Sequence, residues 1–253
     1  MTERREFKQI RVTQKEALPP EQFLSELDEI IEANTHENLV YAAVGDGSLS
    51  EDLLKRLCKE FYYLGVWYTT EFPTLIANAP DTDALWLESS EHYYHWFQNF
   101  ADEAGVLGDP SHVGMKLEWA RQLGISEDEL LAYEPMPETI GSVYTTLYFI
   151  RRSYEEGLAA FAYAGERAAG RTPYARTLYE GMKTHYGIEV QNFYVHAYAE
   201  AEHGDKAEEL VREVAVTPWA QRRMRTAVTL VSRLRGARVV AMNGWLDEPG
   251  ARR

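Results

Sequence analysis

The chain has almost no cysteine: Cys58 is the only one among its 253 residues. No disulfide can form within the chain, which favours a reducing compartment, and we therefore expect a cytoplasmic protein. The N-terminal stretch MTERREFKQI lacks the apolar core of a secretory signal. No apolar run is long enough to cross a bilayer, so a membrane is not among the expected partners.

Positive charge is also scarce. Lys and Arg together number 26 against 40 Asp and Glu, which gives a formal net charge of −14. Because phosphate binding needs clustered Lys and Arg, this balance argues against nucleic acid as a partner.

Strand patterns are missing as well, since no run alternates Val, Ile or Thr with polar residues. Long segments rich in Ala, Leu, Glu and Arg instead predict helices, separated at Gly and Pro. We expect an all-α, single-domain bundle of about seven or eight helices. Its parts would be a loose N-terminal arm over 1–16, a catalytic helical bundle over 17–245 and a C-terminal tail over 246–253. Single helices are expected over 82–104, 140–169 and 188–214.

The segment from Tyr194 to His203, YVHAYAEAEH, is the first candidate for chemistry. His196, Glu200 and His203 are spaced i, i+4, i+7, which places them on one helix face over two turns. Imidazole nitrogen together with carboxylate oxygen suits iron, manganese or zinc. The same stripe is also typical of a solvated helix face, so a metal site needs partners on other helices.

Three residues could supply those partners, because bundle metalloproteins take ligands from facing helices. Glu103 ends an aromatic helix, and His112 lies in the first turn of the next, so the corner between them can bring both to one point. Glu166 lies among Gly and Ala, which leave room around its carboxylate. Each could instead be an ordinary exposed residue.

These six positions resemble the motifs of the heme-oxygenase-like diiron oxidases and oxygenases. That family carries a Glu in an Asn-x-x-Asp-Glu-x-Gly context, a His on the next helix, and a third-helix Glu before a His-x3-Asp-x2-His motif. Here NFADEAG supplies Glu103, and Glu166 precedes His196 by 30 residues. Glu200 stands where the family usually has Asp, and its longer side chain could change the coordination of the second metal.

The resemblance implies a heme-oxygenase-like bundle that binds two Fe(II) ions and uses O2 as co-substrate. The implied metal ligands are Glu103, His112, Glu166, His196, Glu200 and His203, with Glu103 and Glu166 as the carboxylates nearest the chemistry. The implied substrate is a small molecule, an amino acid or amine, that undergoes N-oxygenation, hydroxylation or C–C cleavage in a biosynthetic pathway. An external electron donor and a homodimer are the other partners that we expect.

Sister families with this fold lack the metal and define the alternatives. The TenA-like thiaminases use a cysteine nucleophile on a central helix, whereas Cys58 lies on an early one. The segment TPWAQRRMRTAVTLVSRLR resembles pyrroloquinoline-quinone synthase, a cofactor-free oxidase. A noncatalytic binding or regulatory protein with a solvated polar stripe is the third hypothesis.

Substrate contacts are less constrained by the sequence. Glu60 stands roughly where the thiaminases have an active-site Asp, and Tyr63 could line the same cavity. Arg152 could bind a substrate carboxylate, since arginine does so bidentately. Further arginines crowd the last helix, where most would balance nearby acids on the surface: Arg222, Arg223, Arg225, Arg233, Arg235 and Arg238.

Overall fold

The computed structural model describes residues 16–79, 91–106, 108, 110–167, 173–198 and 203–253, without the side chains of 91 and 203–205. In this part of the chain all regular elements are helical, and the only β-type pairing is an isolated bridge between Leu49 and Arg252. This confirms the predicted all-α fold. None of the described helices is both long and apolar enough to span a bilayer.

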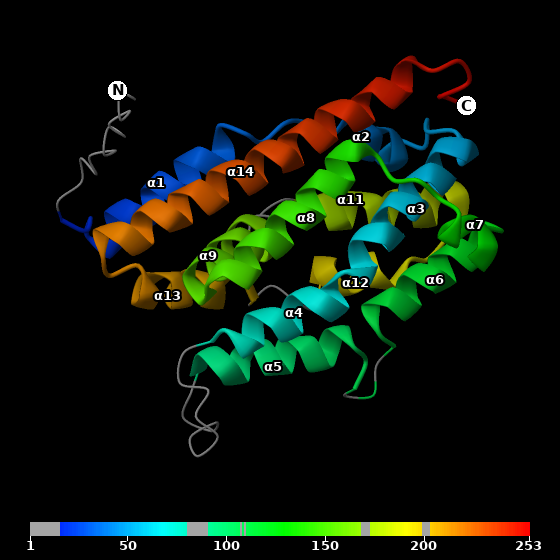
Figure 1. Cartoon of the computed structure of the whole chain (residues 1–253). Helices are drawn as coiled ribbons and strands as arrows, with labels where there is room; N and C mark the ends of the chain where they lie inside the picture. Colours follow the sequence, from blue (N-terminus) through cyan, green and yellow to red (C-terminus); the bar gives the residue numbers. More distant parts are fainter. Residues whose placement is uncertain (1–15, 80–90, 107, 109, 168–172, 199–202) are drawn as a thin grey trace, which may run out of the picture.

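The helices pack in pairs along the bundle (Figure 1). The longest, α14, lies against α1, α8 and η2, while α4 packs on α5, α3 on α6, and α11 on α2 and α12. Their bounds are α1 Pro20–Glu32, α2 Leu39–Gly45, α3 Glu51–Val66, α4 Tyr68–Ala77, α5 Glu91–Glu103, α6 His112–Gln122, α7 Glu127–Leu131, α8 Pro137–Arg152, α9 Tyr154–Gly157, η2 Leu158–Arg167, α11 Tyr174–Gly181, η3 Met182–Tyr186, α12 Gln191–Tyr198, α13 His203–Val214, α14 Pro218–Asn243 and η4 Gly244–Asp247.

Local sequence explains where several helices begin. Proline occupies the first position of α1, α8 and α14, where its missing N–H costs nothing. Ser50 caps α3 by accepting a hydrogen bond from the amide of Leu53. Ser126 and Glu129 form a complete capping box at α7.

Two apolar cores hold the bundle together. The first gathers aromatic side chains of α1, α4, α5 and η2, among them Phe23, Phe72, Trp96 and Phe161. The second gathers side chains of α3, α6 and α12, among them Leu54, Leu57, Trp119 and Phe193. The elements that carry candidate ligands are therefore divided between the two cores. Helices α5 and η2 contribute to the first core, and α6 and α12 contribute to the second.

The single helix predicted over 140–169 is wrong, because α8 ends at Arg152. Ser153 is extended, with φ −167° and ψ 162°, and its hydroxyl accepts a hydrogen bond from the amide of Glu156 to start α9. A Cβ on Gly157 would lie 2.9 Å from the Ile150 Cα, so glycine permits the close crossing after the kink. The chain then continues as a π-helix, η2, a form often found at functional sites.

The helix predicted to start at residue 188 begins at Gln191 instead. The side chain of Gln122 bonds both backbone groups of Glu189, at 3.2 Å each, which satisfies them without a helix. Helix α12 ends at Tyr198 and α13 begins at His203, while 199–202 lie outside the described residues. Of the helix predicted over 82–104, the described part is α5.

Residues 246–253, expected to form a tail, lie against the loop before α3. The amide of Ser50 bonds the carbonyl of Ala251 at 2.9 Å, and the amide of Arg253 bonds the carbonyl of Ser48 at 3.0 Å.

Gly181 offers a test of the packing between α11 and α2. A Cβ at this position would lie 2.5 Å from the Val44 carbonyl oxygen and 2.7 Å from the Gly45 Cα, both backbone atoms. We expect Gly181→Ala to lower the free energy of unfolding by about 1–3 kcal/mol, measured by urea denaturation. Gly244→Ala, at an ordinary helical φ of −62° with no atom within 4 Å, is the matched control and should change it by less than about 0.5 kcal/mol. Equal effects of the two substitutions would contradict this account.

Candidate metal centre

Glu103 and His112 meet across the corner between α5 and α6. The Nδ1 atom of His112 lies 2.7 Å from the Oε2 atom of Glu103, and their side chains are only 4% and 12% exposed. Gly105, with φ 71°, turns the chain after α5. The Ser111 hydroxyl then caps α6 by accepting a hydrogen bond from the amide of Gly114 at 3.0 Å. A helix end, a tight turn and a capped helix start thus create the pair.

His196 approaches this pair from α12, which packs on α6. Its ring centroid lies 5.0 Å from that of His112, with an edge-to-face angle of 75°. One carboxylate and two imidazoles from three helices therefore lie together.

The charges of three acids act on Tyr68, the first residue of α4. The pKa of Tyr68 is raised well above its ordinary value, first by the charge of Glu166, then by burial, and further by Glu103 and Glu71. Glu71 is itself only 4% exposed. Burial and the charge of Glu166 raise the pKa of Glu71 to about 8. The charges of Glu71, Glu103 and Glu166 thus meet at one tyrosine side chain.

Apolar rings border this acidic group. Phe72 and Phe161 pack edge to face at 4.8 Å between centroids, and Trp96 and Phe100 lie beside them. Such surroundings disfavour unpaired negative charge, as the raised pKa of Glu71 reflects. A bound cation would offset that cost.

The described side chains alone do not complete a metal site: no three His, Cys, Asp or Glu among them approach closely enough to hold an ion. Glu200 lies outside the described residues, and the side chain of His203 is not described, so the predicted i, i+4, i+7 stripe is not tested. The donors that are described still fit iron by type, because carboxylate oxygen and imidazole nitrogen are the ligands it prefers.

Sequence reasoning missed Glu71 and Lys116. Glu71 has no motif around it, and only its apolar neighbours in FPTLI hint at burial. Lys116, one turn after His112, is 4% exposed, and its Nζ lies 5.8 Å from the centroid of the Tyr68 ring. Gly65 leaves room for it, since a Cβ there would lie 2.7 Å from the Lys116 Cδ.

Glu60, a predicted substrate contact, is hydrogen-bonded within the fold. It is 2% exposed. Its carboxylate accepts hydrogen bonds from the Tyr133 hydroxyl at 2.6 Å, the Met136 amide at 2.9 Å and the Thr139 hydroxyl at 2.5 Å. These bonds tie α3 to the corner between α7 and α8, so Glu60 stabilises the fold.

The other two predicted substrate contacts also have structural partners. The Arg152 side chain is 45% exposed, and its Nε lies 3.1 Å from Glu156, while Nη1 donates to the Tyr148 hydroxyl at 2.6 Å. These contacts stabilise the backbone at the Ser153 kink. They do not involve Glu71, Glu103 or Glu166. Tyr63 packs edge to face on Trp67, with centroids 6.1 Å apart.

Cys58 is fully buried, and burial raises the pKa of its thiol. A buried, protonated thiol is a poor nucleophile, which argues against the cysteine chemistry of the thiaminases.

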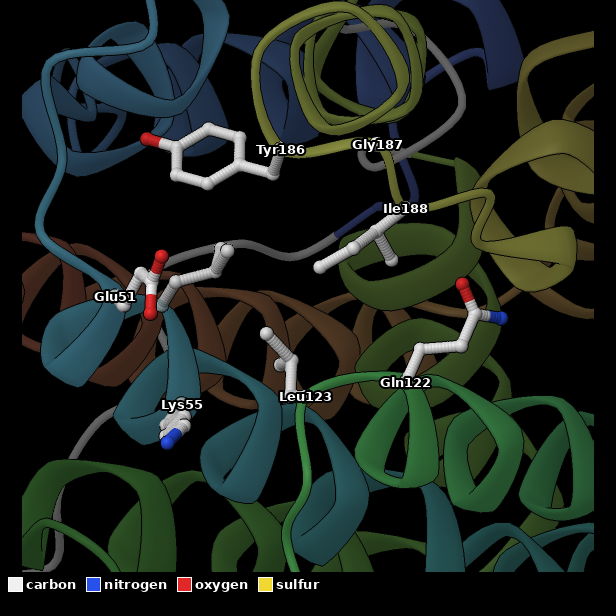
Figure 2. A pocket seen from close by; sticks show the side chains of 8 residues that line it. Glu51, Lys55, Gln122, Leu123, Tyr186, Gly187 and Ile188 are labelled. Carbon is white, nitrogen blue, oxygen red and sulfur yellow. The ribbon is translucent and has the colours of Figure 1, made fainter.

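A surface pocket of about 350 Å³ lies elsewhere, between the start of α3, the end of α6 and residues 186–188 (Figure 2). Its lining includes Glu51, Lys55, Gln122, Tyr186 and Ile188. It opens at the opposite end of α6 from His112, about 15 Å away along the helix axis. The pocket therefore does not belong to the candidate metal centre.

Comparisons with known proteins agree with a set of donors that fits iron by type. Residues 59–236 match a family described as iron-containing redox enzymes, and the chain belongs to that family. Among curated proteins, none matches the sequence.

Solved structures show the same fold. A TenA homolog from Pseudomonas syringae pv. tomato superposes with a TM-score of 0.68 at 15% identity, covering 91% of this chain and 97% of its own. A TenA homologue from Pyrococcus furiosus gives 0.63 at 18% identity, covering 89% and 100%. A domain with a heme oxygenase-like fold from Shewanella denitrificans gives 0.62 at 18%, covering 91% and 94%. The heme-oxygenase-like family and fold predicted from the sequence are thereby confirmed.

The raised pKa of Glu71 predicts how pH changes the stability of the metal-free protein. Its ordinary value is 4.5 and its value in the fold about 8, so between these pH values the folded protein keeps a proton that the unfolded chain has lost. Stability should fall as pH rises through this window and level off above it. Glu71→Gln should lose this part of the slope and exceed the wild type in stability at about pH 8.5.

Urea unfolding of chelator-treated protein at several pH values measures this effect. Glu32→Gln, at an exposed position of α1, is the control and should keep the wild-type slope. Parallel pH profiles for wild type and Glu71→Gln would show that Glu71 does not titrate as described.

Proposed function

We propose that this protein is a nonheme iron oxygenase or oxidase that uses two Fe(II) ions and O2 to oxidise a small molecule. The observation that carries the proposal is the Glu103–His112 pair with the His196 ring beside it, together with the buried Glu71 and the half-buried Glu166, whose charges act on Tyr68 along with that of Glu103. It occurs in a chain that belongs to a family of iron-containing redox enzymes.

The residues that would hold the metals come from several helices. Glu103, His112, Glu166 and His196 are the described members of the set that the resemblance implies, and Glu200 and His203 would complete it. Glu71 is an added candidate, because its carboxylate is buried beside the charge of Glu166. When bound, a pair of ferrous ions supplies the electrons that reduce O2.

The remaining side chains would control protons and water. Tyr68 keeps its proton at neutral pH, because nearby carboxylates and burial raise its pKa. Its hydroxyl is therefore a hydrogen-bond donor placed among the acids that would bind metal. The rings of Phe72, Phe100 and Phe161 would keep bulk water from this region.

The substrate class rests on the resemblance. An amino acid or amine would undergo N-oxygenation, hydroxylation or C–C cleavage in a biosynthetic pathway. An external electron donor would restore the ferrous state where the substrate does not. A cytoplasmic location and a homodimer complete the proposal. The competing hypotheses, a cofactor-free oxidase and a noncatalytic binding protein, require no iron.

Iron binding tests the proposal directly. After anaerobic Fe(II) loading and desalting, the wild type should retain about two iron ions per chain. Glu166→Ala and His196→Ala should each retain at most about half of that, because each loses a ligand. His185→Ala, an exposed histidine of η3, is the matched control and should bind as the wild type does. Absence of bound iron in the wild type, or unchanged iron in both variants, would refute the proposal.

The substitution Tyr68→Phe tests whether the Tyr68 hydroxyl supplies a proton, without removing a metal ligand. The variant keeps the ring but loses the hydroxyl, so iron content should stay at the wild-type level. Single-turnover O2 consumption by the Fe(II)-loaded protein should slow by about tenfold or more, as expected for a lost proton donor. Tyr94→Phe, at an exposed position of α5, should change neither quantity. A Tyr68→Phe variant that consumes O2 at the wild-type rate would exclude this role.

A further inference from the structure

Two arginines of α14 lie close to the candidate metal centre. Arg235 and Arg238 are spaced i, i+3, so they share one face of the helix. The Nη1 atom of Arg235 donates to the carbonyl oxygens of Ala164 at 2.6 Å and Gly165 at 2.8 Å, in the turn of η2 that carries Glu166. The charge of Glu166 in turn acts on the guanidinium of Arg235.

Several tyrosine side chains lie near these arginines. Tyr41 and Tyr174 stack with centroids 5.9 Å apart and planes at 29°. Burial raises the pKa of both hydroxyls, while the charges of Arg235 and Arg238 oppose that rise. Tyr68 is close enough to Arg235 and to Glu166 to interact electrostatically with both.

These side chains share an unusual degree of burial. Tyr41, Tyr68, Tyr174 and Arg235 each keep some accessible surface, although they lie inside the packing of α2, α4, α11 and α14. Burial still shifts the pKa of each. These polar side chains are therefore only partly shielded by the helices around them.

The charge of Glu166 offsets part of the positive charge in this region, but no ion pair neutralises it within the described residues. Elsewhere on α14, Arg223 pairs with Glu156, and Arg225 pairs with Glu26 at 2.6 Å. Arg235 and Arg238 make no ion pair within the described part of the chain, and their mutual repulsion adds to the cost of burying Arg235. The Nε atom of Arg238 is buried without a hydrogen-bond partner among the described residues. A buried, unsatisfied donor is costly, and an anion would relieve that cost.

We propose that Arg238, together with Arg235, binds a carboxylate group of the substrate, whose apolar or aromatic body packs against Tyr41 and Tyr174. Arg235 contacts the turn of η2 that carries Glu166, so a substrate held in this way would extend toward the metal centre. The inference rests on the proposed function for the identity of that centre, and it narrows the substrate class to small organic carboxylates.

Binding to the full-length, metal-free protein tests the inference without iron or turnover. The probes are acetate, hexanoate and 3-phenylpropionate, each compared by calorimetry with the alcohol of the same skeleton. We expect the wild type to bind 3-phenylpropionate most tightly and the alcohols about tenfold or more weakly. Arg238→Gln should weaken 3-phenylpropionate binding by about tenfold or more, and Arg238→Lys should restore part of the affinity.

Arg233→Gln is the matched control, because Arg233 is an exposed arginine of the same helix. Its affinity should equal that of the wild type, and circular dichroism should show that all variants are folded. The inference is overturned if no carboxylate binds the wild type, if the alcohols bind equally well, or if Arg238→Gln keeps full affinity. A protein that binds carboxylates but no iron would refute the proposed function while leaving this inference intact.

Discussion

The burial of acidic side chains around Tyr68 is the constraint on which the rest of the structure depends. A carboxylate removed from water needs donors or a cation, because its charged form is otherwise disfavoured. The protein treats two buried glutamates in opposite ways. Glu60 accepts three hydrogen bonds and serves the fold. Glu71 instead is buried near the charge of Glu166, and burial together with that charge raises its pKa.

The irregular geometry of the helices around Glu166 determines where its carboxylate lies. The kink at Ser153 and the close crossing at Gly157 precede Glu166, which itself lies within the π-helical turns of η2. A regular helix through this region would rotate its side chains differently, since each π-turn adds a residue to the repeat. Arg235 satisfies two carbonyl groups of η2 at the point where it nears the acids. Helix α14 thus supports η2 as well as the core.

Much of the fold and part of the site could be predicted because their signals are local. Proline and serine at helix starts and the absence of alternating apolar patterns indicated an all-α bundle. The corner between Glu103 and His112 was predicted from a helix end followed by a helix start, and the structure places the two side chains 2.7 Å apart. Glu71 escaped prediction because burial beside Glu166 depends on how α4 packs on distant helices. The contacts of Arg152 with Glu156 and Tyr148 could not be predicted for the same reason, since they depend on the kink at Ser153.

The amino-acid sequence by itself determined the helical class, the order of the candidate ligands and, with a single cysteine, the absence of a disulfide within the chain. These properties follow from periodicity, capping and composition, which act over a few residues. Only the tertiary structure decided which acids share one region and which arginines face them. Electrostatic interaction and burial depend on distances between segments that are far apart in the chain, and no local pattern encodes those distances.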